Sequence, residues 1–354
     1  MPEPNITYLL GAGASYNALP VSQNMQSKIK EFICWIEQFE VDNTPFSPQD
    51  SILITKREAQ LKFVKDLNWL SSNIDPFKPI DQFASKLYEK NERDFQKLKA
   101  TLSCYFLLEQ ARNDRKNIDE RYRYFFAEFR NNNMLDKLPH RVKIISWNYD
   151  LQFEKALLEF YPGKDIVFAQ NHLQVISSTS SNEPKPKEFS IVKLNGTAGL
   201  HTYRDNRDKL LGFQNIVIKD NTDTELIEEC LRIYALYLYS GLLVPYLNFA
   251  FEKNNELTKR AFEFALQIAK QTDELIVIGY SFPDDNREVD KNLLKSMTNL
   301  SKIYIQNPDY AIETKIQSIL ETSKTEMYEY IQCLDSFFIQ EDLFPYTNDS
   351  VFWG

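Results

Sequence analysis

The sequence predicts an α/β protein with an open parallel sheet, helices on both faces of the sheet and a large helical insertion. Short apolar segments with the composition of buried strands recur along the chain. Segments with apolar residues at three- and four-residue spacing, which is typical of helices, separate them. Strands that alternate with helices in this way usually form one parallel sheet. The five expected strands are residues 6–10, 142–147, 189–194, 274–279 and 302–306.

The helical insertion is expected between the first two strands, over about residues 21–138. The segments QSKIKEFICWIEQF and DERYRYFFAEFRNN within it have helical spacing. Two further helices are expected at about 223–243 and 255–272. The insertion should form a lobe over the strand ends, and no linker separates two independent domains. We therefore expect one domain over residues 1–310 and a C-terminal extension, residues 311–354, that packs on it or pairs with it.

The charge of the chain argues against nucleic-acid binding. The 354 residues include 41 basic and 50 acidic side chains, for a net charge of −9. Binding to nucleic acid depends mainly on cationic contacts with phosphates. The mixed-charge segment KLYEKNERDFQKLK is more typical of a solvated helix face, and helix packing explains RYRYFF. A local cationic pocket remains compatible with this charge.

The cysteines and the apolar segments predict a soluble cytoplasmic protein without a structural metal. The four cysteines are far apart and form no Cys-x-x-Cys pair, so we expect free thiols in a reducing compartment and no zinc site. We see no signal peptide at the start of the chain. The apolar run over 233–247 is too short to span a bilayer, and Pro245 interrupts it.

The first strand is followed by the glycine turn GAGAS, residues 11–15. In a doubly wound sheet, the turn after the first strand is where a pyrophosphate meets the N-terminus of a helix. Glycine lets the backbone approach the phosphates, free amides and the helix dipole attract them, and Ser15 can donate a hydrogen bond. The third glycine of the dinucleotide fingerprint is absent. On this motif alone, a tight turn without a ligand explains the glycines equally well.

The other expected strands also end in small or polar residues. They are followed by Asn148-Tyr149-Asp150, Asn195-Gly196-Thr197, Gly279-Tyr280-Ser281 and Asn307-Pro308. The carboxyl ends of parallel strands meet at one edge of a sheet, where open α/β folds bind their ligands. Together with the glycine turn, these segments predict one shared ligand site.

In this order, the motifs resemble those of the sirtuin-like family, and specifically its bacterial branch without deacetylase activity. The set consists of GAGAS, NYD, KLNGT, LLVPY, GYSFPDD and the asparagine-proline pair, and it extends from Ile6 to Asp309. The resemblance to the deacetylases is weaker. Their cysteine pairs for zinc are absent, and their proline-aspartate-phenylalanine-arginine run is replaced by Pro20 to Gln23. These differences count against protein deacetylation.

The resemblance implies a Rossmann-like site for NAD⁺, as substrate or ligand, without a metal. Gly11, Ala12, Gly13, Ala14 and Ser15 would line the pyrophosphate and the nearby ribose. Asn148 would lie beside the nicotinamide ribose and Asp150 near the carboxamide, while Gly279, Ser281 and Asn307 would face the adenosine half. Many relatives hydrolyse NAD⁺ to nicotinamide and ADP-ribose, and several act in anti-phage defence.

The chain lacks the family's histidine base, because Asn195 stands before Gly196 in KLNGT. An amide cannot accept a proton near neutral pH as imidazole does. Two interpretations stay open. In the first, the protein is an NAD⁺ glycohydrolase in which Asn148, Asp150 and Asn195 act, with His201 as a substitute base. In the second, the site is degenerate and binds NAD⁺ or ADP-ribose as a sensor or scaffolding subunit. Either way, we expect a homo-oligomer or a complex with a partner protein.

Overall fold

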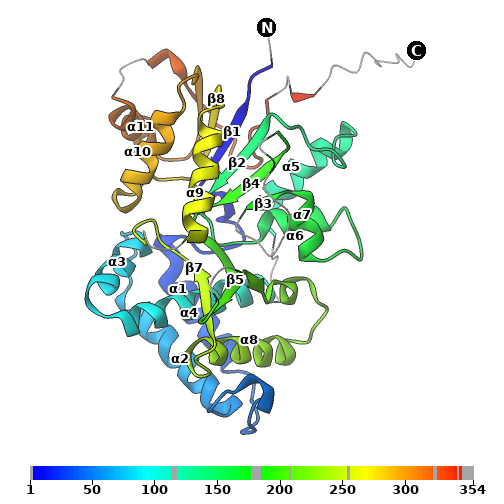
Figure 1. The fold of residues 1–354 in the computed structure, drawn as a ribbon, viewed down its shortest axis with the longest axis vertical. Coiled ribbons are helices and arrows are strands. Elements are labelled where there is room, and N and C mark those ends of the chain that lie inside the picture. The colour runs from blue at the N-terminus through cyan, green and yellow to red at the C-terminus, as the bar shows by residue number, and fades with distance from the viewer. Residues whose placement is uncertain are drawn as a thin grey trace.

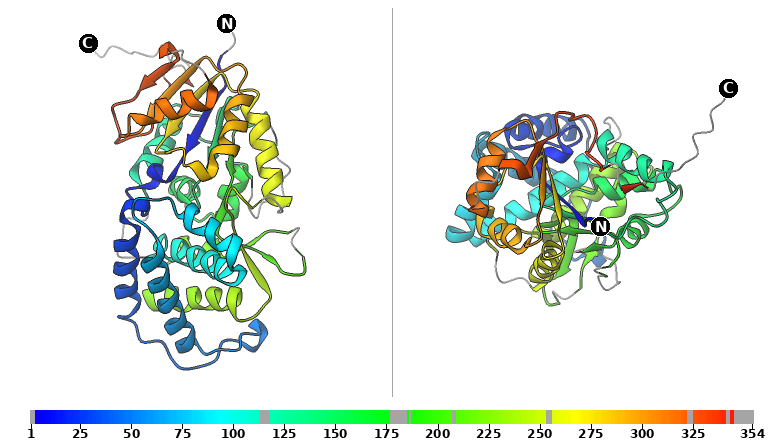
Figure 2. Two further views of the ribbon diagram at one scale, coloured as in Figure 1. Left: turned by 90° about the vertical axis from the view of Figure 1, so that its left-hand side faces the viewer. Right: turned by 90° about the horizontal axis from the view of Figure 1, so that it is seen from above.

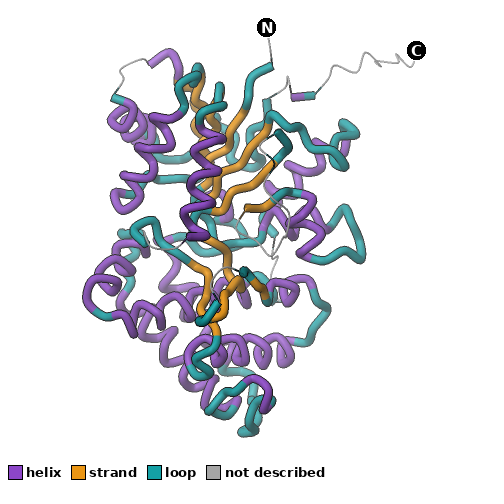
Figure 3. Tube along the Cα trace, viewed as in Figure 1, coloured by secondary structure: helices purple, strands orange, loops and turns teal. Residues whose placement is uncertain are grey.

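The computed structural model contains a large parallel sheet and, beyond the ends of its strands, a lobe of helices with a small second sheet (Figure 1). A view from the side shows the lobe extending the molecule away from the sheet (Figure 2). The strands occupy the middle of the molecule, between helices (Figure 3). The structure describes residues 3–112, 118–176, 185, 187–206, 209–252, 256–321, 325–340 and 343–344.

The large sheet has seven strands in the order β10-β9-β8-β1-β2-β4-β3, and all its neighbouring strands are parallel. Each of the five expected strands is present within one residue of its predicted bounds. Tyr8 and Leu10 point into one hydrophobic core and Leu9 into another, so both faces of the sheet are buried. This explains why the strands are apolar throughout, and it confirms the predicted Rossmann-like fold. The strands are β1 (Ile6–Leu10), β2 (Val142–Ser146), β3 (Val175–Ile176), β4 (Ser190–Lys193), β8 (Glu274–Ile278), β9 (Lys302–Gln306) and β10 (Tyr328–Tyr330).

The topological switch point of the sheet lies between β1 and β8. From β1 the chain continues through β2 to β3 and β4 on one side, whereas β8, β9 and β10 extend the other side. Open parallel sheets bind ligands at the carboxyl ends of their strands, at such a switch point. Leu10 pairs with Ile278 at these ends, so the turns that follow β1 and β8 face each other there.

Helices cover the sheet on both sides, as predicted. The core that contains Leu9 is closed by α9 (Glu256–Ala269), α10 (Arg287–Ser296) and α11 (Ala311–Leu320). The core that contains Tyr8 is closed by α5 (Glu120–Asn131), α6 (Gln152–Leu158) and α7 (Ile166–His172).

The helical lobe is built from two stretches of chain rather than one. Four helices of the predicted insertion pack around α8 and a three-stranded antiparallel sheet, β6-β5-β7, which come later in the chain. The remaining long helix of the insertion, α5, packs on the large sheet instead. Helical spacing indicates that one face of a helix is buried, but it does not indicate which element buries that face. The sequence therefore could not distinguish α5 from the helices of the lobe. The elements of the lobe are α1 (Ser22–Ile36), α2 (Lys56–Asn73), α3 (Ile80–Lys90), α4 (Glu92–Glu109), α8 (Asp223–Leu238), β5 (Gly196–Tyr203), β6 (Leu211–Gly212) and β7 (Leu243–Leu247).

The helix predicted over 223–243 ends earlier, at Leu238. Gly241, with φ +71°, turns the chain, and the apolar residues that follow form β7. Pro245 lies within this strand, which is tolerated because β7 is an edge strand of the small sheet.

The C-terminal residues that the structure describes pack on the large sheet. β10 adds an edge strand to the sheet through its pairing with β9. The side-chain amide of Gln306 donates hydrogen bonds to the carbonyl oxygens of Cys333 and Ser336, each over 2.6 Å. Residues 345–354, and most of the polar segment 177–188, lie outside the described residues. Within the described part of the chain, no helix has the length and apolar character needed to cross a membrane.

Candidate functional site

The turns that follow β1 and β8 are in direct backbone contact at the switch point. The amide of Gly11 donates to the carbonyl of Ile278 (3.1 Å), and the amide of Gly13 donates to that of Gly279 (3.0 Å). A Cβ atom at Gly279 would lie 2.3 Å from the carbonyl carbon of Gly13, and Gly279 also has φ +58°. A Cβ atom at Gly13 would lie 2.8 Å from Gly279 Cα. Only glycine allows two main chains to approach this closely.

This contact revises the expected role of the glycine amides. The amides of Gly11 and Gly13 are engaged across the switch point, and that of Ala14 donates to the carbonyl of Gly11 (2.9 Å). The turn continues into a short 3₁₀ helix, Ala12–Ser15, and the first α-helix starts only at Ser22. The expected cradle of free amides at the start of a long helix is therefore not what the structure contains. The sequence indicated that space was needed beside the glycines, but a neighbouring turn fills it.

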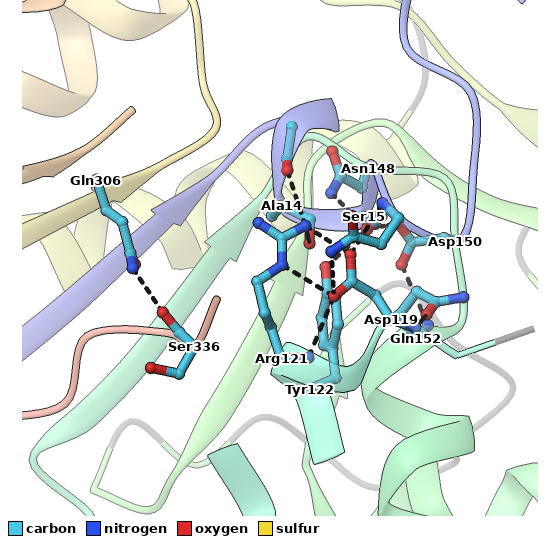
Figure 4. Close-up of polar contacts among 12 residues, drawn as sticks. Ala14, Ser15, Asp119, Arg121, Tyr122, Asn148, Asp150, Gln152, Gln306 and Ser336 are labelled. Atoms are coloured by element: carbon cyan, nitrogen blue, oxygen red, sulfur yellow. Dashed lines mark hydrogen bonds and ion pairs between the residues drawn. The ribbon is translucent and has the colours of Figure 1, made fainter. Parts of the chain in front are cut away.

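Four polar side chains meet beside this turn, and we call them the Ser15 cluster: Ser15, Tyr122, Asn148 and Asp150 (Figure 4). Ser15 Oγ lies 2.6 Å from Asp150 Oδ2, 2.7 Å from the Tyr122 hydroxyl and 3.4 Å from Asn148 Nδ2. Asn148 Nδ2 also donates to the carbonyl of Gly11 (2.9 Å). All four side chains are buried. Three of the residues were expected in the site, whereas Tyr122 was not.

The electrostatics of the cluster indicate how its protons are shared. Burial raises the pKa of Asp150, and the nearby Lys193 ammonium opposes this rise. Lys193 Nζ donates to the carbonyl oxygen of Asp150 (2.6 Å) and to Glu154 Oε1 (2.7 Å), so it supports the loop as well. Burial, with a contribution from Asp150, raises the pKa of Tyr122, so its hydroxyl keeps its proton. Tyr122 thus donates to Ser15, and Ser15 donates to Asp150.

An arginine from α5 clamps the glycine turn from the other side (Figure 4). Arg121 Nη2 donates to the carbonyl oxygens of Gly13 (3.1 Å) and Ala14 (2.9 Å). The same guanidinium binds Asp119 through Nε (2.8 Å) and Nη2 (2.5 Å). Asp119 in turn accepts from the amide of Asn17 (3.1 Å). The RYRYFF segment therefore contributes Arg121 and Tyr122 to the site, in addition to its role in helix packing.

The loops that follow β8 and β9 lie next to each other. Asn307 Nδ2 donates to the carbonyl oxygen of Tyr280 (3.1 Å), and Lys315 Nζ donates to that of Ser281 (2.6 Å). The Tyr280 ring stacks on Trp147, with ring centres 5.8 Å apart, and its hydroxyl lies 2.8 Å from Asp290 Oδ2. Gly279, Ser281 and Asn307 therefore gather on one side of the switch point, as expected for their common place at the strand ends.

Asn195 and His201 lie in different surroundings. Asn195 is buried, and its Nδ2 lies 3.4 Å from the carbonyl oxygen of Trp147, so it borders the Asn148 loop. His201 lies on β5, stacked on Phe213 at 4.4 Å between ring centres. The register of β5 against β7 is irregular between Gly196 and His201, and the ring of His201 packs in the helical lobe, beside Phe213 and Tyr237 of α8. Burial lowers the pKa of His201 to about 4.

Asp81, at the start of α3, is a candidate site residue that the sequence analysis did not single out. Its Oδ1 atom is buried and has no hydrogen-bond partner among the described residues. Burial raises the pKa of Asp81 to about 6, and Asp285 adds to this rise. Burial also raises the pKa of Tyr149 and Tyr280, and the charge of Asp81 contributes to both shifts. The charge of Asp81 therefore acts on the loops that follow β2 and β8. No sequence signal distinguishes it from other acidic residues at helix starts.

Comparisons with known proteins find similarity only at the level of structure. No family model matches the sequence, and no curated protein matches it significantly. A Sir2 homologue in complex with NAD has 12% identity and a TM-score of 0.38, covering 90% of this chain and 89% of the other. A mutant Sir2 homologue bound to ADP-ribose has the same identity and TM-score, with coverages of 90% and 92%. Sir2 bound to an acetylated peptide has 14% identity and a TM-score of 0.33, covering 92% of this chain and 85% of the other. Similarities this low assign neither a family nor a ligand.

No metal centre is evident in the described part of the chain. Among those residues, no group of three or more His, Cys, Asp or Glu side chains is arranged to hold a metal ion.

The close contact at the switch point predicts a large stability loss for Gly279→Ala. The new Cβ atom would overlap the backbone of Gly13, and the positive φ adds strain, so we expect a loss of roughly 3 kcal/mol in the free energy of unfolding. Gly163→Ala is the matched control, because Gly163 has φ +79° but nothing within 4 Å of the added Cβ. It should cost only about 1 kcal/mol. Urea unfolding of both variants measures the difference, and equal losses would contradict the importance of the contact.

Proposed function

We propose that this protein binds NAD⁺ at the switch point of its parallel sheet and cleaves the bond between nicotinamide and ribose. One observation carries the proposal. The Ser15 cluster and the glycine contacts join three strand-end turns, after β1, β2 and β8, that are far apart in the sequence. They meet where open parallel sheets bind nucleotides. The motif set GAGAS, NYD and GYSFPDD adds support from its resemblance to the sirtuin-like family.

Breaking the bond between nicotinamide and ribose requires little acid–base catalysis from the protein. Nicotinamide is a cationic substituent in NAD⁺ and leaves as a neutral molecule, so its departure needs no general acid. As nicotinamide leaves, the ribose acquires the character of an oxocarbenium ion, and a nearby negative charge stabilises this positive charge. Asp150 supplies a buried carboxylate, held in place by Ser15 and Lys193. Asn148 is positioned by its bond to Gly11, and its amide can orient ribose hydroxyls or water.

In this proposal Asp81 takes the place of the histidine base that Asn195 replaces. A carboxylate with a pKa of about 6 is largely ionised at neutral pH and can accept a proton from the attacking water. Its buried Oδ1 has no hydrogen-bond partner among the described residues. Asn195 keeps a positioning role beside the Asn148 loop. His201 is assigned a packing role, because it stacks on Phe213 within the lobe.

A second candidate is an inactive protein that binds NAD⁺ or ADP-ribose as a sensor or scaffolding subunit. The observation that favours it is the absence of an imidazole at Asn195, together with the engaged amides of Gly11, Gly13 and Ala14.

A role in anti-phage defence, within a homo-oligomer or with a partner protein, has support only from the resemblance of the motifs. A partner would then supply the signal that starts turnover.

Nicotinamide release distinguishes the two candidates. Purified protein is incubated with NAD⁺, products are separated chromatographically, and binding of NAD⁺ and ADP-ribose is measured by calorimetry. The glycohydrolase proposal expects release that Asn148→Ala reduces at least ~10²-fold. Asn292→Ala, an exposed position on α10, is the matched control and should leave the rate unchanged. Binding without release would favour the sensor, and neither binding nor release would reject both.

The assignment of Asp81 predicts a specific pH dependence. The rate of release should rise as pH increases through about 6, where the carboxyl loses its proton, and stay level above this. Asp81→Asn should lower the rate ~10²–10⁴-fold and abolish the rise. Asp75→Asn, which changes an exposed aspartate just before α3, serves as the control.

The same variant has a stability readout that does not depend on activity. Because the pKa of Asp81 is raised in the folded state above the ordinary 3.8, ionisation at higher pH destabilises the fold. Asp81→Asn should therefore be more stable than the natural protein above pH 6, by up to roughly 3 kcal/mol. Urea unfolding at pH 4 and pH 8 measures this. A variant that loses stability at pH 8 would contradict a net cost of ionising this carboxyl group in the folded state.

A further inference from the structure

A cavity lies in the helical lobe, and its lining residues are distinct from those of the strand-end site. Its volume is about 650 Å³, which is within the range of small-molecule sites. Its walls come from α2, the first turns of α4, the end of α8, and β7. None of its lining residues belongs to the candidate site described above. Five of them are cationic: Lys62, Lys65, Arg93, Lys97 and Arg204.

The cations of this cavity outnumber its carboxylates. Asp66 and Asp94 are its acidic residues, so five positive and two negative charges leave a net charge of +3. The whole chain carries −9, so this concentration of positive charge runs against the charge of the protein. Like charges held together repel each other, and a bound anion relieves that repulsion.

The two carboxylates are already engaged by neighbouring groups. Asp94 forms an ion pair with Lys97 (2.8 Å) and accepts a hydrogen bond from Asn91 (2.7 Å). Asp66 accepts from the hydroxyl of Tyr234 (2.6 Å), and burial raises its pKa. The charges of Lys65 and Lys97 oppose this rise, so Asp66 offsets part of the charge of these two lysines, whereas no carboxylate of the cavity is described against Lys62, Arg93 or Arg204.

Four of the five cations form no ion pair among the described residues. Lys62 Nζ lies 5.1 Å from the centre of the Tyr239 ring, and Arg204 Nε donates to the carbonyl oxygen of Gly241 (3.0 Å). No ion pair with a carboxylate is described for Lys65 or Arg93, both of which are exposed side chains that reach the cavity. Lysine ammonium and arginine guanidinium groups are the usual partners of phosphate oxygens.

We propose that this cavity binds a small phosphorylated metabolite with at least two phosphate groups, of the size of a nucleoside di- or triphosphate. The volume accommodates such a molecule, and Lys62, Lys65 and Arg93 lie ready to contact its phosphates. The half-buried ring of Tyr239 offers an apolar surface for a base or sugar. The proposal does not depend on NAD⁺ cleavage, because the two sites share no residue.

Calorimetric titration with inorganic triphosphate and with ATP, both without magnesium, tests the proposal on the 354-residue chain. The cavity variant combines Lys62→Gln, Lys65→Gln and Arg93→Gln. The control combines Lys30→Gln, Lys219→Gln and Lys270→Gln, which are exposed positions outside the cavity. Both triple variants change the net charge by −3, so they differ only in where the charge is lost. Thermal unfolding confirms that both are folded, and the single variant Arg93→Gln replaces the cavity triple if it is not.

The expected result is binding of both probes that the cavity triple weakens at least about tenfold, while the control triple retains it. Asn148→Ala should also retain it, which excludes binding at the strand-end site. Tighter binding of ATP than of triphosphate would indicate that the ring of Tyr239 contacts the base or sugar. Equal binding of the two probes would indicate that the cavity recognises the phosphates alone. The proposal is overturned if neither probe binds, if both triples lose affinity equally, or if Asn148→Ala abolishes binding.

Discussion

The site depends on the backbone contact between the glycine turn after β1 and the turn after β8. Gly11, Gly13 and Gly279 let two main chains meet at distances that any Cβ atom would prevent. Hydrogen bonds from the amides of Gly11 and Gly13 then fix one turn against the other. Because this contact lies at the switch point, it decides where every strand-end residue can be placed. A chain that lost it would lose the geometry of Ser15 and Asn148 as well.

The polar side chains beside this contact form a buried network in which each group limits the others. The hydroxyl of Ser15 can donate only one hydrogen bond, and Asp150 accepts it. The Tyr122 hydroxyl must therefore be the donor in its hydrogen bond with Ser15. Lys193 offsets part of the burial cost of two carboxylates, Asp150 and Glu154. Buried polar groups are costly when unpaired, so such a network holds its members in one arrangement. The proposed cleavage of NAD⁺ would use that rigidity to orient a ribose.

The helical lobe changes the chemistry that the sheet alone could support. It holds the carboxyl group of Asp81 in surroundings that raise its pKa to about 6, and the charge of Asp81 contributes to the raised pKa of Tyr149 and of Tyr280. The same lobe places His201 in an aromatic environment that lowers its pKa to about 4. Burial thus raises the pKa of a carboxyl group and lowers that of an imidazole, so that the carboxylate has the higher pKa of the two. The chemical name of a residue does not decide its suitability as a base.

The sequence by itself determined the parallel sheet, its five long strands and the strand-end residues of the site, because apolar periodicity and glycine scarcity are local signals. It also indicated helices on both faces. The tertiary structure decided which helices belong to the lobe, since an amphipathic helix does not specify its partner. It also decided that the amides of Gly11 and Gly13 face a neighbouring turn, and that Arg121 and Tyr122 lie beside the glycine turn. These depend on contacts between residues distant in the chain, which a one-dimensional pattern does not contain.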